Sequence, residues 1–268
     1  MIVAVLATFL AVESTALASC DELADKLQDT LDRAKMAMEP ESNIGAIYDW
    51  ATEAKDRCVS DERIAYLRLR ASELGAGNTV GRQPLSALQQ WRSLSQAMTR
   101  QFPNSARIAT IQARASGTVE DARRAVALDP SYAPAQVALA SALVTTDPAG
   151  AAARLSSLKQ LGAVSDGYTL LACARFALHD FDGAAKAASL ALRGRESSLI
   201  EPDGRDPRPL SKAHEILGLI DLERRNYRAS VAHLRSAAPD SERARAILEN
   251  PPKTLRPFLP RRRQATLQ

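Results

Sequence analysis

The sequence is poor in aromatic residues and has no run in which apolar and polar residues alternate. Only 12 of its 268 residues are Phe, Tyr or Trp, and runs of β-branched residues are few. Sandwiches, barrels and parallel sheets are built from such segments, so these folds are excluded. The chain instead contains 49 Ala and 33 Leu residues, which favour helices. We therefore predict an all-α protein.

The body of the chain has no excess of charge of either sign. Residues 19–249 hold 30 basic and 30 acidic side chains. A neutral body gives no support to nucleic-acid binding. Residues 250–268 carry five basic residues, no acid and four prolines, and they are predicted to form a flexible basic tail. Its expected contact is an anionic membrane or cell-wall polymer, through Arg261, Arg262 and Arg263.

No Lys or Arg precedes the first apolar run, Ile2–Val12. The run is followed by Ala16-Leu17-Ala18, which is typical of a signal-peptide core and its cleavage site. It is too short to span a bilayer, which takes about 20 residues. We predict that residues 1–18 are a signal peptide and that the protein is exported to the periplasm. A buried helix is the alternative, and the missing basic residues leave the true start open.

Cysteines are scarce, and two of the three lie near the N-terminus. Leu17-Ala18-Ser19-Cys20 resembles the lipobox of bacterial lipoproteins, in which the cysteine is acylated. Ser19 and Glu22, however, have the spacing of a helix-capping box, which places Cys20 in a first helical turn. An antiparallel helical hairpin over residues 19–59 brings Cys20 beside Cys58. A disulfide, a lipid anchor on Cys20 and two free thiols all remain open.

Two segments of the chain, Tyr168–Leu192 and His214–Ala238, align without a gap. Each has a small residue in its first helix, an aromatic residue in the turn and small residues in its second helix, and a further copy starts at Tyr132. This pattern resembles the tetratricopeptide repeat (TPR) of bacterial cell-envelope proteins. The resemblance implies a right-handed α-solenoid of helix-turn-helix repeats over residues 60–249, with the hairpin as its N-terminal cap. The charged, Pro-containing segment 193–211 is predicted to be an inserted loop.

The resemblance also implies a concave groove, lined by the first helix of each repeat, that binds another protein. Most groove positions are apolar, so an apolar or helical partner segment is favoured over an acidic C-terminal peptide. Cys173 has a second interpretation as a small core residue. The groove positions given by the repeat register are Val137, Ser141, Val144, Thr169, Cys173, Phe176, Glu215, Leu219 and Leu222.

Catalytic and nucleotide-binding motifs are missing, so we expect no enzymatic activity, no cofactor and no catalytic residue. The three histidines, His179, His214 and His233, fall at different repeat positions and are not expected to converge on a metal. We therefore expect an exported scaffold or adaptor for another envelope protein. The alternatives are a lipid-anchored assembly factor and, ranked below it, a helical enzyme of cell-wall metabolism.

Overall fold

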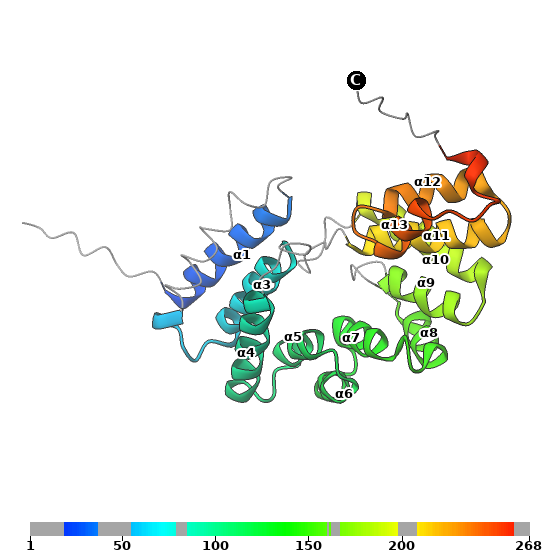
Figure 1. Ribbon diagram of the computed structural model, residues 1–268. Helices are drawn as coiled ribbons and strands as arrows, with labels where there is room; N and C mark the ends of the chain where they lie inside the picture. Colours follow the sequence, from blue (N-terminus) through cyan, green and yellow to red (C-terminus); the bar gives the residue numbers. More distant parts are fainter. Residues whose placement is uncertain are drawn as a thin grey trace, which may run out of the picture.

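The computed structural model describes residues 19–36, 55–78, 85–159, 161, 167–197 and 208–259. Within these ranges all regular structure is helical, and the helices follow an open arc (Figure 1). The helices are α1 (Cys20–Met36), α3 (Glu62–Asn78), α4 (Leu85–Gln101), α5 (Ala106–Ser116), α6 (Val119–Leu128), α7 (Ala133–Leu143), α8 (Pro148–Ser157), α9 (Gly167–Ala177), α10 (Phe181–Ser197), α11 (Arg208–Glu223), α12 (Tyr227–Ala237) and α13 (Glu242–Glu249).

The helices from α3 to α12 form five consecutive pairs. The first helices of the pairs, α3, α5, α7, α9 and α11, contact one another in succession, whereas neighbouring second helices in the described part of the chain make at most marginal contact. The second helices α4, α6, α8 and α10 each pack between their own first helix and the first helix of the next pair, and α12 packs between α11 and α13. The first helices therefore form the inner layer of the arc, as α5, α7 and α9 do in Figure 1.

Polar caps fix several helix starts. The side chains of Ser105, Thr118, Asp147 and Ser241 each accept a hydrogen bond from a backbone N–H in the first turn of α5, α6, α8 and α13. Gly117, with a φ of 70°, ends α5 in the left-handed conformation that glycine adopts freely. The short turns between paired helices thus follow from the local sequence.

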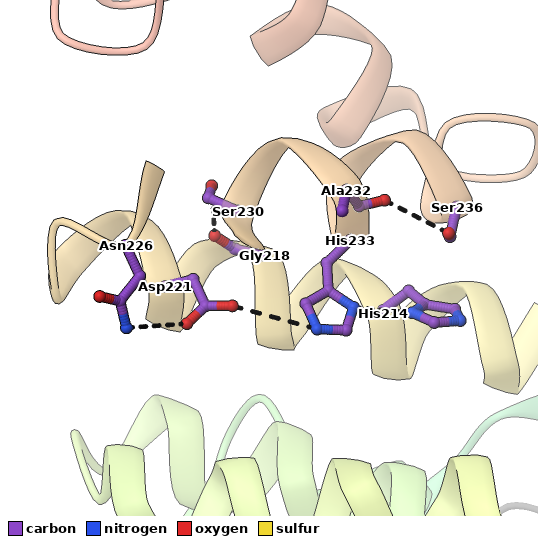
Figure 2. A network of polar contacts seen from close by, with 8 residues as sticks. All are labelled: His214, Gly218, Asp221, Asn226, Ser230, Ala232, His233 and Ser236. Carbon is purple, nitrogen blue, oxygen red and sulfur yellow. Dashed lines mark hydrogen bonds and ion pairs between the residues drawn. The ribbon is translucent and has the colours of Figure 1, made fainter. Parts of the chain in front are cut away.

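Small residues let the paired helices approach closely. A Cβ atom at Gly218 would lie 2.8 Å from Leu234 Cγ, and Ser230 Oγ donates a hydrogen bond to the Gly218 carbonyl at 2.8 Å (Figure 2). The equivalent residues of the preceding pair, Ala172 and Ala184, are fully buried. The close crossing of α11 and α12 therefore requires the small residues that the repeat pattern identified.

The N-terminal helix α1 packs against α3 and begins as the capping box predicts. Ser19 N–H donates to Glu22 Oε2 at 2.8 Å, and Glu22 N–H donates to Ser19 Oγ at 3.2 Å. Cys20 is joined to Cys58 by a disulfide, with their Cα atoms 5.8 Å apart. Residues 55–57 are helical, while residues 1–18 and the rest of the predicted second hairpin helix lie outside the described residues.

The predicted loop 193–211 is wrong at both ends. Helix α10 continues to Ser197, and α11 already begins at Arg208. Pro209 does not break α11, because a proline in the first turn removes only an N–H that has no partner within the helix. Residues 198–207 lie outside the described residues.

The predicted flexible tail is also wrong in its first part. Leu255 is fully buried in a cluster with Val231 and Leu234, and the Tyr227 and Phe258 rings lie 5.5 Å apart. A short 3₁₀ turn at Arg256–Phe258 follows Leu255. Helices α12 and α13 would otherwise leave an apolar face exposed at the end of the solenoid, and residues 255–258 pack against it. Arg261, Arg262 and Arg263 lie outside the described residues.

Candidate functional site

The inner layer of first helices is the candidate binding surface, but four of the nine predicted groove residues are not accessible there. Val137, Thr169, Glu215 and Leu219 are all buried. The expectation that these side chains face solvent is wrong. The reason is that successive first helices contact one another, so α7, α9 and α11 cover each other's flanks.

The other five predicted residues remain open to different degrees. Ser141 is exposed, and the other four are half-buried. All five lie in the second half of a first helix or directly after it. We call this set the inner strip: Ser141, Val144, Cys173, Phe176 and Leu222. It carries no charge, so it suits an uncharged or apolar contact.

Cys173 in the inner strip is not an activated nucleophile. Burial raises the pKa of its thiol, and the nearby Glu215 carboxylate acts in the same direction while Lys212 opposes it. A nucleophilic cysteine requires the thiolate form, which a raised pKa disfavours. The side chain packs beside the large apolar cluster of α7–α11. The structure thus agrees with its interpretation as a small packing residue.

The buried Glu215 carboxylate has a hydrogen-bond partner on each oxygen. It accepts hydrogen bonds from Lys212 Nζ and from Ser241 Oγ, each at 2.9 Å. The Ser241 hydroxyl also caps α13, and Ser211 Oγ donates to Asp240 Oδ2 at 2.6 Å. The carboxylate therefore fastens α11 to the start of α13 and is not available to a partner.

Sequence reasoning missed the polar side chains that join the first helices of the first two pairs. Arg114 Nε on α5 lies 3.1 Å from Glu73 Oε1 on α3, and the Arg107 guanidinium lies 5.9 Å from the centre of the Tyr66 ring. Both arginines belong to a first helix of a pair. Extending the repeat register upstream of α7 would have placed them in the inner layer.

Two histidines of the last pair meet, contrary to the expectation from their repeat positions. His214 Nδ1 on α11 and His233 Nδ1 on α12 are 3.0 Å apart. His233 Nε2 lies 4.0 Å from Asp221 Oδ2, and Asn226 Nδ2 donates to Asp221 Oδ1 at 3.3 Å (Figure 2). Burial lowers the pKa of His214, and the nearby His233 lowers it further. In an antiparallel helix pair, the start of one helix lies beside the end of the other. This geometry of α11 and α12 is the signal that could have indicated the contact.

Larger clusters of metal-ligating side chains are not found in the described part of the chain. There, no group of three or more His, Cys, Asp or Glu side chains has an arrangement that could hold a metal ion. Of the helices described, none is both long and apolar enough to cross a membrane.

Comparisons with known proteins bear on the fold alone. No protein-family model and no curated protein matches the sequence. The structure is similar to a chain of the APC/C hetero-tetramer Cut9–Hcn1, with a TM-score of 0.62 and 12% sequence identity. The similarity covers 90% of this chain and 46% of that chain, so this chain spans about half its length. The predicted TPR-like α-solenoid is thereby confirmed.

Proposed function

We propose that the protein is an exported scaffold or adaptor that binds another envelope protein through the inner strip. The observation that carries this proposal is that five uncharged side chains, at matching register positions of three successive first helices, remain exposed or half-buried. Rigid helices hold these side chains, so a partner segment meets a surface that needs little ordering on binding. A helical or extended apolar segment matches such a surface.

The proposal of export is supported by the cysteine pair. Disulfides form and persist in oxidising compartments such as the bacterial periplasm. The Cys20–Cys58 bond, together with Ala16-Leu17-Ala18 just before it, favours a mature chain that starts at Ser19 or Cys20. A lipid anchor would use the same Cys20 sulfur atom, so the bond and the anchor exclude each other.

Mass spectrometry of the protein from the membrane and periplasmic fractions tests the proposal of export and the state of Cys20. The expected mass is that of a chain starting at Ser19 or Cys20, two hydrogens lighter than the reduced chain. A diacylglyceryl adduct on Cys20 would show the lipid-anchored assembly factor instead, and retention of residues 1–18 would contradict export.

A photo-crosslinking amino acid tests the binding surface. Placed at Ser141, which is exposed on the first helix α7, it should give a discrete adduct with one envelope protein in living cells. The matched control is Arg123, which is exposed on the second helix α6. Equal adducts from both positions would contradict use of the inner surface, as would their absence from Ser141.

A further inference from the structure

We infer that His214 and His233 form a two-imidazole chelating site for a divalent transition metal, with Cu²⁺ preferred over Zn²⁺. Their Nδ1 atoms face each other across the crossing of α11 and α12 at 3.0 Å. Imidazole nitrogen is a good ligand for both metals. This inference is independent of the inner strip and of the proposed function.

The distance between the two nitrogens is short enough for both to bind one metal ion. With metal–nitrogen bonds of about 2.0–2.1 Å, nitrogens 3.0 Å apart subtend about 90° at the metal. Tetrahedral zinc sites, in contrast, require about 3.3 Å between two nitrogens at the same bond length. An angle near 90° matches square-planar or tetragonal Cu²⁺, which also has the highest affinity among the divalent first-row metals.

The helices that carry the two imidazoles are held in place before a metal binds. The helices that carry them cross at Gly218, where Leu234 and the Ser230 hydroxyl make close contacts. A chelating pair on such a fixed crossing loses little side-chain freedom on binding. The pair is therefore a stronger ligand than two independent surface histidines.

Asp221 acts as a positioning residue for His233. Its carboxylate lies 4.0 Å from Nε2, beyond hydrogen-bond distance, and its negative charge favours the tautomer that carries a proton on Nε2. In this tautomer Nδ1 of His233 carries the lone pair that a metal ligand needs. Asn226 holds the carboxylate from the opposite side, at 3.3 Å. The His233 side chain is 31% exposed, which leaves coordination positions for water.

The test uses Cu²⁺ alone, added to the full chain without a histidine tag. Cys173→Ser is introduced throughout to prevent reduction of Cu²⁺ by the free thiol. Calorimetry should give one ion per chain, and electron paramagnetic resonance should give a tetragonal spectrum with two coupled imidazole nitrogens. His214→Gln and His233→Gln should each remove one coupled nitrogen, while circular dichroism monitors the fold.

His179→Gln is the matched control, because it removes the third histidine, which is exposed in the turn between α9 and α10. It should leave the affinity and the spectrum unchanged. Asp221→Asn should weaken binding about tenfold and keep two coupled nitrogens.

Three results would overturn the inference. One is the absence of Cu²⁺ binding to the parent chain, which would leave the contact a plain hydrogen bond between two imidazoles. Another is equally strong binding by the folded double variant His214→Gln/His233→Gln. The third is a higher affinity for Zn²⁺ than for Cu²⁺.

Discussion

At the scale of single residues, two turns place a side chain where glycine is usual. His179 and Arg225 have φ values of 59° and 61°. The next N–H in each turn donates to the carbonyl five residues earlier, Asn226 to Asp221 at 2.8 Å and Asp180 to Arg175 at 2.9 Å. This bond is typical of a Schellman helix end, in which a left-handed glycine avoids steric strain. These repeats therefore keep avoidable strain in their turns.

Arg225→Gly should stabilise the protein by about 0.5–1 kcal/mol. Relief of the left-handed strain, roughly 1–3 kcal/mol, outweighs the extra freedom that glycine gives the unfolded chain. Urea denaturation measures the change. Ala232→Gly, at an exposed position inside α12, is the control and should destabilise by about 1 kcal/mol. A loss of stability in Arg225→Gly would show that the turn does not strain its side chain.

The lowered pKa of His214 predicts a pH-dependent stability. Because the folded chain binds this proton less readily than the unfolded chain, stability is present above the ordinary histidine value of 6.5. It should fall as the pH drops below that value toward the lowered pKa. The midpoint of urea denaturation is measured at stepwise lower pH values, from 7.5 to 5. Over this range it should fall less in His214→Gln than in the parent chain.

The charged and titratable groups near His214 in this test are His233 beside it and Asp221 beyond His233. His179→Gln removes a histidine outside this pair and serves as the control. If the urea midpoint of His214→Gln depended on pH as strongly as that of the parent chain, His214 would not be a source of the acid sensitivity.

At the scale of helices, Glu215 and Ser241 join α11 to α13. Ser241→Ala removes the helix cap and one partner of a buried carboxylate, so it should cost about 2–3 kcal/mol. Thr118→Ala removes a cap of the same kind from α6 without a buried carboxylate and should cost about 1 kcal/mol. Equal losses in the two variants, measured by urea denaturation, would show that the contact with Glu215 contributes nothing.

The disulfide ties the start of α1 to the segment before α3. It closes a separation of 38 residues, for which the chain-entropy model gives roughly 3–4 kcal/mol. Reductant should lower the melting temperature of the parent chain to that of Cys20→Ser/Cys58→Ser. The double variant should not respond to reductant, so a further loss there would show an effect unrelated to this bond.

The sequence predicted helices and caps better than it predicted burial. Ser19 with Glu22 and the small residue at Gly218 are local signals, and the structure shows both contacts. The repeat register assigns Val137 and Leu219 to an open groove because it identifies the inner layer. How deeply a side chain lies in that layer depends on how closely the neighbouring pair stacks, and a single repeat does not encode this distance.

The same limit explains the histidine pair and the end of the solenoid. His214 and His233 have no shared motif, and only the crossing of α11 and α12 brings them together. Leu255 follows two prolines that indicate a tail, yet it fills the apolar end that α12 and α13 leave open. Both are tertiary contacts, so only the antiparallel pairing of the helices and the open end of the last pair could have indicated them.

At the scale of the whole molecule, each helix pair depends on its neighbours for burial. The apolar clusters run from one pair to the next, and α1 and residues 250–259 lie against the ends of the stack. In a solenoid, stability is close to the sum of the repeats and their interfaces, so an uncovered end weakens the last pair most. The C-terminal segment is therefore part of the fold up to residue 259.

This division of the tail predicts that two truncations differ. Deleting residues 260–268 removes Arg261, Arg262 and Arg263 and should leave the melting temperature unchanged. Deleting residues 251–268 also removes buried Leu255, and should cost about 2 kcal/mol or more of unfolding free energy.

Binding to anionic vesicles separates the two roles of the tail. Because residues 19–249 hold 30 basic and 30 acidic side chains, both truncations should lose most of the binding that the full chain shows. Interspersed charges on the helices largely cancel beyond a Debye length of about 8 Å at physiological salt, whereas three adjacent arginines act together. Neutral vesicles are the control. If the chain that lacks residues 260–268 kept its binding to anionic vesicles, the contact would lie elsewhere on the protein. Arg193, which is exposed on α10, would then be the first residue to substitute.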